Sequence, residues 1–453
     1  MLWRPFVSTL ALACALSLAG MARADILIKN ATLYDGTGAP AVKGANILVK
    51  GDLIAQISTK PISAGRAKVI DATGKFVTPG LIDSHVHIRG GQAGSVRDGA
   101  RRPIVDRGMA MPTLWGYLYS GVTTIYDSGN NAEFVIPLRD DERAGKIVSP
   151  RIFAAGGVIS VPGGYGAGAT SLKATTWEEF RPQLEAKINR EHPDMLKMTK
   201  EQQGMYAAKS VPTLSDDMIK HITDFARERG VRSTVHASAE PMAEAAVLNG
   251  VSAMAHPVQR SVLNDSFVKL LVDRKIPIST TMQGYLTIAK LQDEGGMAFL
   301  DTPLFQATMT AEEIADTKGP ERDDYIKNDL PAQRKVAEKY ARANIKRLFD
   351  AGVILTSGTD KAYGPYTHVE LQSLNMSGIS PFDLIKIGTL NGAIYLGREK
   401  DLGSIEAGKY ADILVLDADP AADVKNFQAI NAVIKNGQQI ERAKLDLPVN
   451  RKK

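Results

Sequence analysis

Short apolar runs alternate with helix-like periodicity through most of the middle of the chain. Eight of these runs have the length of buried strands, and turn residues separate them from their neighbours. They cover residues 77–87, 122–126, 151–155, 195–198, 231–236, 252–256, 276–280 and 353–357. Strands that alternate with helices favour an α/β fold, and this number of strands predicts a (β/α)8 TIM-type barrel over residues 79–397.

Two segments between the predicted strands have the clearest helical pattern. The first begins at Ser215 as its N-cap and ends at Gly230. Its apolar residues recur at helical spacing and should form the buried face: Met218, Ile219, Ile222, Phe225 and Ala226. The second helix ends at Gly352, and its apolar positions are Val336, Tyr340, Ala343 and Leu348.

The two ends of the chain have the sequence pattern of an all-β module. Residues 25–78 consist of short apolar runs with turn signals between them, and the same pattern returns in residues 398–453. In the second segment, an apolar run leads into Asn436-Gly437, which is a strong hairpin signal. Each end is too short to bury a core of its own. We therefore predict one small β-sandwich made from both ends, with the barrel inserted between them.

Residues 1–24 have the composition of a signal peptide. Arg4 precedes an apolar run over residues 6–19, and Ala22-Arg23-Ala24 matches a cleavage site. The run is shorter than the ~20 apolar residues that a transmembrane helix needs. We expect cleavage after Ala24, with a retained anchor as the alternative, and Cys14, the single cysteine, would leave with the peptide. The mature chain has no other run long enough to span a membrane, which indicates an exported protein, periplasmic or secreted.

The charge of the chain gives no sign of a nucleic-acid partner. The formal net charge is +5, and Arg4 and Arg23 contribute two of these charges within the signal peptide. The remaining charges are scattered, whereas nucleic-acid-binding proteins concentrate basic residues in a patch. Without Cys14 the mature chain also has no cysteine, which excludes disulfides and thiolate chemistry.

Two histidines one residue apart, His85 and His87, end the first predicted barrel strand. Alternate residues of a strand point to the same side, so both imidazoles would converge on one point, as metal ligands do. The alternative is a pair of histidines that only pack at a strand end, because so short a motif also arises by chance. The rest of the chain must decide between these interpretations.

Other polar residues fall at the ends of further predicted strands. His236 ends the fifth strand, His256 ends the sixth, and Asp360 follows the eighth. Lys197 lies within the apolar fourth strand, where its charge is costly to bury without a partner. Alone, each has a structural interpretation as a core histidine, a turn aspartate or a surface lysine. Barrel enzymes carry their catalytic groups at these strand ends, so the joint placement favours a single site.

The chain resembles the amidohydrolase superfamily of metal-dependent hydrolases. The motifs that carry the likeness span nearly the whole mature chain: Pro79-Gly80-Leu81-Ile82-Asp83-Ser84-His85-Val86-His87, Gly121-Val122-Thr123-Thr124, Pro150-Arg151-Ile152-Phe153, Val235-His236-Ala237, Gly358-Thr359-Asp360 and Gly403-Ser404-Ile405-Glu406-Ala407-Gly408-Lys409-Tyr410-Ala411-Asp412. Within the superfamily, the chain looks most like the Xaa-Pro dipeptidase and imidazolonepropionase-related branch, which includes ochratoxin-type amidases. Imidazolonepropionases have one metal and no bridging lysine, so Lys197 favours the two-metal dipeptidase side.

The resemblance implies a site for two divalent metal ions. His85, His87 and Asp360 would hold one ion, His236 and His256 would hold the other, and Lys197, carboxylated by CO2, would bridge them. Imidazole and carboxylate ligands suit zinc, with manganese and iron as alternatives. A bridging hydroxide would attack the amide carbonyl, and Asp360 would pass the proton of the water to the leaving nitrogen.

The motifs determine the substrate contacts less well. Tyr165, in the glycine-rich loop 161–168, stands where related enzymes often have a histidine. Arg89 and His368 lie just beyond the first and eighth strands and would meet a substrate carboxylate, with a surface role as the alternative. The charged, loop-rich insert over residues 283–330 is expected to form a lid rather than a surface excursion.

These interpretations lead to an exported hydrolase of amide bonds in small molecules. A dipeptidase or carboxypeptidase-like enzyme that acts on N-acyl amino acid type substrates is the leading hypothesis. A lactonase, or an amidase of a bulky secondary metabolite such as ochratoxin, is the alternative within the same chemistry. A catalytically silent metal- or solute-binding protein is the alternative from another class, and Asp360 argues against it because a binder needs no proton shuttle. The sequence leaves a homo-oligomeric state open.

Overall fold

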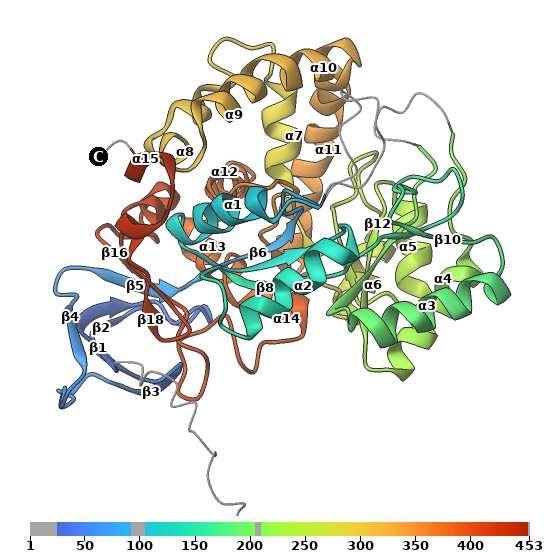
Figure 1. Cartoon of the computed structure of the whole chain (residues 1–453). Helices are drawn as coiled ribbons and strands as arrows, with labels where there is room; N and C mark the ends of the chain where they lie inside the picture. Colours follow the sequence, from blue (N-terminus) through green and yellow to red (C-terminus); the bar gives the residue numbers. More distant parts are fainter. Residues whose placement is uncertain (1–24, 92–104, 204–209, 452–453) are drawn as a thin grey trace, which may run out of the picture.

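The structure, a computed structural model, describes residues 25–91, 105–203 and 210–451. It contains an α/β part and a β-sheet built from both ends of the chain, which lies at the lower left of Figure 1. The predicted signal peptide with Cys14 lies outside these residues. No helix in the described ranges is both long and apolar enough to cross a membrane.

One sheet joins the two ends of the chain. Its strand order is β18-β17-β16-β5-β1-β2-β3, and β4 pairs with β1. The strands are β1 (Ile26–Leu33), β2 (Val42–Lys50), β3 (Leu53–Ser58), β4 (Lys68–Asp71), β5 (Phe76–Pro79), β16 (Ile413–Leu416), β17 (Ile430–Lys435) and β18 (Gln438–Gln439). The junction is the antiparallel pair of β5 and β16, in which Pro79 faces Ile413. The two ends thus share one sheet, whereas a two-layer sandwich stays a prediction.

The hairpin predicted from Asn436-Gly437 is present. These two residues connect β17 to β18, which pair in antiparallel register. Their φ angles are 50° and 68°. Positive φ at both central residues matches the type I′ turn, whose twist suits an antiparallel pair.

Alternate residues of β16 pack on opposite faces of the sheet. Ile413 and Val415 belong to the apolar core of the sheet itself. Leu414 and Leu416 belong to the large core of the α/β part. A strand that is buried on both faces must be apolar throughout, which explains the unbroken run in the sequence. The sheet is therefore packed directly against the α/β part.

The α/β part contains parallel strands in two sheets. One sheet has the order β6-β7-β8, and the other has the order β10-β9-β11-β12-β13-β14-β15. The strands are β6 (Leu81–Val86), β7 (Val122–Asp127), β8 (Arg151–Ala154), β9 (Ile159–Ser160), β10 (Leu172–Lys173), β11 (Met195–Thr199), β12 (Arg232–His236), β13 (Ala253–Met254), β14 (Ile278–Ser279) and β15 (Leu355–Thr356). All eight predicted strands are found, and only β9 and β10 lie outside them. The prediction of an α/β fold is confirmed.

Backbone hydrogen bonds connect the two parallel sheets at two places. Asp194 N, just before β11, donates to Ala154 O of β8 at 3.0 Å. Ser84 N of β6 donates to Ser357 O, just after β15, at 2.9 Å. The first bond joins the end of β8 to the start of β11, and the second joins β6 to the end of β15. A closed eight-stranded barrel stays a prediction.

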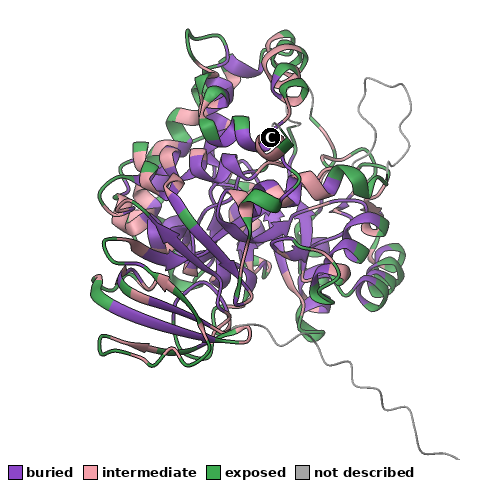
Figure 2. Cartoon of the chain, turned by 60° about the vertical axis from the view of Figure 1, so that its left-hand side comes forward, coloured by how far each residue is buried: buried purple, intermediate pink, exposed green. Residues whose placement is uncertain are grey.

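Helices connect the parallel strands and cover them, and Figure 2 shows the buried residues gathered along the strands at the centre of the molecule. The main helices are α1 (Arg107–Tyr119), α2 (Ala132–Arg143), α3 (Trp177–Glu191), α4 (Asp216–Glu228), α5 (Glu240–Leu248), α6 (Asp265–Asp273), α11 (Leu330–Asp350), α12 (Pro365–Met376), α13 (Pro381–Ile387), α14 (Leu390–Leu396) and α15 (Pro448–Arg451). Helix α4 begins as predicted, because Ser215 Oγ accepts a hydrogen bond from Met218 N at 3.1 Å. Its predicted apolar face is buried.

Helix α11 exists as predicted, but of its four predicted apolar positions only Leu348 is buried. Val336 and Tyr340 are 58% and 36% exposed, whereas Ala341, Ile345 and Leu348 are buried. The buried stripe also contains Asn344, whose amide donates to Val258 O and Ser261 O and accepts from Leu263 N. A polar residue with satisfied hydrogen bonds interrupts the apolar pattern, so the pattern located only part of the buried face.

The insert over residues 283–330 is mostly helical, which corrects the expectation of a loop-rich segment. It contains α7 (Met282–Ala289), α8 (Pro303–Thr308), α9 (Ala311–Asp316) and α10 (Arg322–Lys327), at the top of Figure 1. A small apolar core holds it to α12, formed by Leu300, Phe305, Met309, Ile314 and Tyr366. Short amphipathic turns that pack on a neighbouring helix carry too little periodicity to be recognised from sequence.

Candidate active site

His85 and His87 stand at the C-terminal end of β6, with their rings turned toward the same space. The ring centroids are 5.4 Å apart. His85 Nδ1 donates to Ala255 O at 3.2 Å, and His87 Nδ1 donates to Gly129 O at 2.8 Å. When both rings are neutral, a proton on Nδ1 leaves the lone pair of each Nε2 available to a metal ion. Both rings are therefore oriented as ligands.

Asp360 faces these two nitrogens from the loop after β15. Its Oδ1 lies 3.0 Å from His87 Nε2 and 3.5 Å from His85 Nε2. The ligand atoms of the three residues lie within 4.8 Å of one another. Burial acts to raise the pKa of Asp360, but the neighbouring imidazoles outweigh it and hold the pKa well below its ordinary value. The group is thus a carboxylate placed to share one cation with two imidazoles.

His256 and His236 extend this pair into a group of four imidazoles. The His256 ring centroid is 4.7 Å from that of His85 and 4.6 Å from that of His236. Burial lowers the pKa of both His85 and His256 well below the ordinary value, which favours neutral rings. Neutral imidazole is the form that binds metal ions.

Lys197 lies on β11 beside the imidazoles and is buried. Besides burial, the lysine charge lowers the pKa of His85, His236 and His256, which places it near all three. Its Nζ donates to Ser128 Oγ at 3.0 Å, an uncharged partner. Burial lowers the pKa of the Lys197 ammonium to about 8. The residues present therefore fit divalent ions, because imidazoles, a carboxylate and a readily deprotonated amine converge in one place.

Glu201 is a site residue that the sequence reading missed. Its Oε2 lies 3.6 Å from His236 Nε2, and Ser238 N donates to the same oxygen at 3.3 Å. Burial acts to raise the pKa of Glu201, but hydrogen bonds from His236 and Ser238 outweigh it and lower the pKa to about 2. A carboxylate on the outer nitrogen of a ligating histidine orients the ring. Its position two residues past β11 was the available signal.

Asp127, at the end of β7, is a second residue that the sequence reading missed. Its carboxylate accepts hydrogen bonds from Ile88 N at 2.8 Å and from Gly129 N at 3.1 Å. Ile88 follows His87, and Gly129 O is the acceptor for His87 Nδ1. Asp127 thus fixes both backbone segments that set the orientation of the His87 ring.

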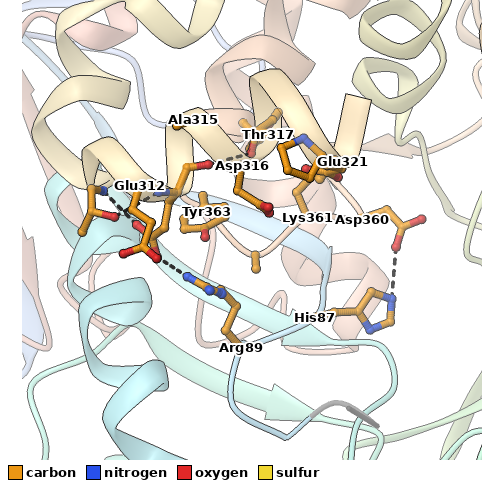
Figure 3. A pocket seen from close by; sticks show the side chains of 15 residues that line it. His87, Arg89, Glu312, Ala315, Asp316, Thr317, Glu321, Asp360, Lys361 and Tyr363 are labelled. Atoms are coloured by element: carbon orange, nitrogen blue, oxygen red, sulfur yellow. Dashed lines mark hydrogen bonds and ion pairs between the residues drawn. The ribbon is translucent and has the colours of Figure 1, made fainter. Parts of the chain in front are cut away.

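A cavity of about 920 Å³ opens beside His87 and Asp360, and both residues line it (Figure 3). Arg89 lines the same cavity, but its guanidinium forms an ion pair with Glu313 of α9 and lies 5.3 Å from the Tyr363 ring centroid. Residues 310–321 of the insert supply one wall of the cavity. The insert therefore borders the cavity, and its role as a lid stays a prediction.

The other two predicted substrate contacts, Tyr165 and His368, lie in different places. The Tyr165 ring stacks on His236, with centroids 4.5 Å apart, so Tyr165 lies beside the imidazole group. His368 is buried within α12, and its Nε2 donates to Ser120 O at 2.8 Å. It does not line the cavity, because α12 turns this ring toward the end of α1. The predicted contact between His368 and a substrate carboxylate therefore does not fit the position of this ring.

Comparisons with known proteins agree with this geometry. The model of the amidohydrolase family matches residues 76–440. The chain is 24% identical to ochratoxinase of Aspergillus niger over 441 residues, which cover 88% of the chain and 83% of the ochratoxinase. It is 25% identical to imidazolonepropionase of Alkaliphilus metalliredigens over 413 residues, covering 87% and 89% of the two chains.

A solved structure has the same fold. A Xaa-Pro dipeptidase with methionine bound in its active site superposes with a TM-score of 0.71 at 22% identity, over 92% of this chain and all of the dipeptidase. The family match spans both the site and the greater part of the described fold. The chain therefore belongs to the amidohydrolase family and is a hydrolase that acts on carbon–nitrogen bonds.

Proposed function

We propose that the protein is a binuclear metal-dependent amidohydrolase that cleaves an amide or peptide bond, as a dipeptidase or carboxypeptidase-like enzyme acting on N-acyl amino acid type substrates. The observation that carries the proposal is the meeting of four imidazoles, Lys197 and Asp360 at the ends of parallel strands. The proposal includes closure of these strands into a (β/α)8 barrel, because closure explains why five strand ends reach one place.

The ligands divide into two sets. His85, His87 and Asp360 would hold one ion, and His236 and His256 would hold the other, with zinc as the expected metal. Carboxylated Lys197 would contribute an anion to both. When bound, the ions supply an activated water and polarise the substrate carbonyl.

The protein's own groups set up the reaction around this centre. Ala255 O and Gly129 O fix the rings of His85 and His87 through their Nδ1 hydrogens. Asp360, at the edge of the cavity, takes the proton of the attacking water and delivers it to the leaving nitrogen. The insert forms one wall of the cavity and would limit the access of bulk water to the site as a lid.

An amidase of a bulky metabolite, or a lactonase, is the second candidate. The cavity of about 920 Å³ supports it, because a dipeptide does not fill such a volume. The similarity to ochratoxinase over most of both chains supports it as well.

The test combines metal analysis with a substrate panel. Purified protein should contain close to two transition-metal ions per chain and should hydrolyse a member of a panel of dipeptides, N-acyl amino acids, bulky aryl amides and lactones. Exhaustive chelation should abolish the hydrolysis, and zinc should restore it. Two bound metals without any hydrolysis would indicate the silent binder, and full activity without metal would refute the proposal.

We also propose that the protein is exported and cleaved after Ala24. The support is the run over residues 6–19 followed by Ala22-Arg23-Ala24. The mass of the protein recovered from outside the cytoplasm should correspond to a chain that begins at Asp25. Recovery of exported protein that still begins at Met1 would contradict the proposal.

A further inference from the structure

Two basic side chains of the cavity follow the proposed metal ligands closely in the sequence. Arg89 comes two residues after His87, and Lys361 comes immediately after Asp360. Both line the cavity, and Figure 3 shows Arg89 turned toward the helices of the insert. A basic residue in such a place is suited to bind a carboxylate of the substrate.

The insert already supplies a carboxylate to each of them. Arg89 Nη1 forms an ion pair with Glu313 Oε1. Lys361 Nζ lies 3.3 Å from Glu321 Oε1. The Arg89 and Glu313 side chains are 28% and 24% exposed, so this pair is shielded from water more than an ordinary surface pair. Both basic groups are thus neutralised from within the protein.

Glu313 is held in place by the start of its own helix. Thr310 N donates to Glu313 Oε2 at 2.8 Å, and Glu313 N donates to Thr310 Oγ1 at 3.1 Å. This capping box fixes one carboxylate oxygen at the N-terminus of α9. The other oxygen then points at Arg89, so the ion pair follows from the position of the helix.

The remaining charges of the cavity are acidic. Glu312 and Asp316 of α9 line it in addition to Glu313 and Glu321, and Asp360 belongs to the metal ligands. Acidic side chains therefore outnumber the two basic ones, Arg89 and Lys361, among the residues that line the cavity. A second carboxylate beside Arg89 would therefore meet like charge, whereas an ammonium group would be attracted.

We propose that Glu313 serves as a built-in carboxylate that occupies Arg89, so that the part of the substrate lying in this cavity is neutral or cationic and bears no carboxylate. The inference rests on the proposed amidase function and adds the charge class of the substrate group beside Arg89. Glu313 is then a specificity-determining residue, and Arg89 is its partner rather than a receptor for the substrate.

Two glutamine variants separate the effect of freeing Arg89 from the effect of removing one negative charge from the cavity. Glu313→Gln removes the charge that faces Arg89, and glutamine still satisfies the capping box, so α9 should stay in place. Glu312→Gln removes the same charge from the neighbouring position and leaves the Arg89–Glu313 pair intact. Only the first variant frees Arg89.

The experiment uses amides of one amine with size-matched acyl groups: β-alanyl, butyryl and succinyl. A second series keeps one acyl group and places a cationic, a neutral or an anionic group on the amine side. In the series whose variable group enters the cavity, kcat/KM of the wild type should be lowest for the anionic member. Glu313→Gln should raise that value by about tenfold relative to the neutral member, as expected for a freed charge-assisted contact. Glu312→Gln should change the ratio much less.

The outcomes distinguish this inference from the proposed function. Hydrolysis of the neutral amides tests the function. The order of kcat/KM among the cationic, neutral and anionic members tests the inference. If no amide is hydrolysed, calorimetry gives the order of binding affinity among the cationic, neutral and anionic compounds. A wild type that prefers the anionic member, or a Glu313→Gln variant that matches Glu312→Gln in both series, would overturn the inference.

Discussion

Replacement of Lys197 by alanine should give a folded protein that has lost at least one metal ion per chain and most of its turnover. Two divalent cations a few ångströms apart repel strongly in a low-dielectric site, so an anion between them is required. No Asp or Glu lies within Met195–Met198, and Lys197 is the only residue of that run able to supply one, as a carbamate. Loss of an outer ligand partner costs about 10–100-fold in activity, and loss of a bridging ligand should cost at least as much.

The fold should survive this change. Lys197 is buried and donates to Ser128 Oγ, so alanine removes a charge that is costly to bury. Metal content by elemental analysis, kcat and thermal unfolding should be measured together. Lys197→Glu should recover part of the metal binding, because a carboxylate also bridges two cations.

Lys200 is the matched lysine for comparison, and it has structural contacts of its own. Its Nζ donates to Leu214 O at 2.9 Å and to Asp216 Oδ1 at 2.6 Å, which ties the segment after β11 to the start of α4. Lys200→Ala should therefore lose about 1–3 kcal/mol of stability through the unpaired groups, yet keep both metals. If Lys197→Ala kept two metals and near-normal rates while Lys200→Ala did not, the bridge would belong to Lys200.

Asp360→Asn should lower kcat by about 10²–10⁴-fold, the usual contribution of a general acid–base group. Asparagine keeps the shape and one ligand oxygen of aspartate, but it cannot take up and return a proton. The backbone should tolerate the change, because Asp360 has φ of 55°, a region that asparagine adopts readily.

Metal content shows which role of Asp360 is lost. Two retained ions with a low kcat and an unchanged KM would indicate proton transfer, and a lost ion would indicate ligation. A variant with both metals and a kcat within tenfold of the wild type would rule out Asp360 as the proton carrier. Asp216→Asn is a suitable control, because Asp216 pairs with Lys200 and does not line the cavity.

Local patterns in the sequence predicted most of the elements and the proposed ligand set. Ser215 predicted the start of α4, and Asn436-Gly437 predicted the turn between β17 and β18, because caps and tight turns depend on a few adjacent residues. The spacing of His85 and His87 predicted a shared direction, because alternation along a strand is a property of the backbone. Parallel strands end on one side, so the remaining ligands could be assigned strand by strand.

Only the tertiary structure decided what surrounds these ligands. Arg89 and Glu313 are 224 residues apart in sequence, and their pairing depends on how the insert packs over β6. Glu201 meets His236 because β11 and β12 are neighbours. Asn344 is buried, and His368 is turned away from the cavity, because hydrogen-bond partners on other elements are within reach. Such contacts arise from the packing of distant segments, so they leave no periodic signal in the sequence.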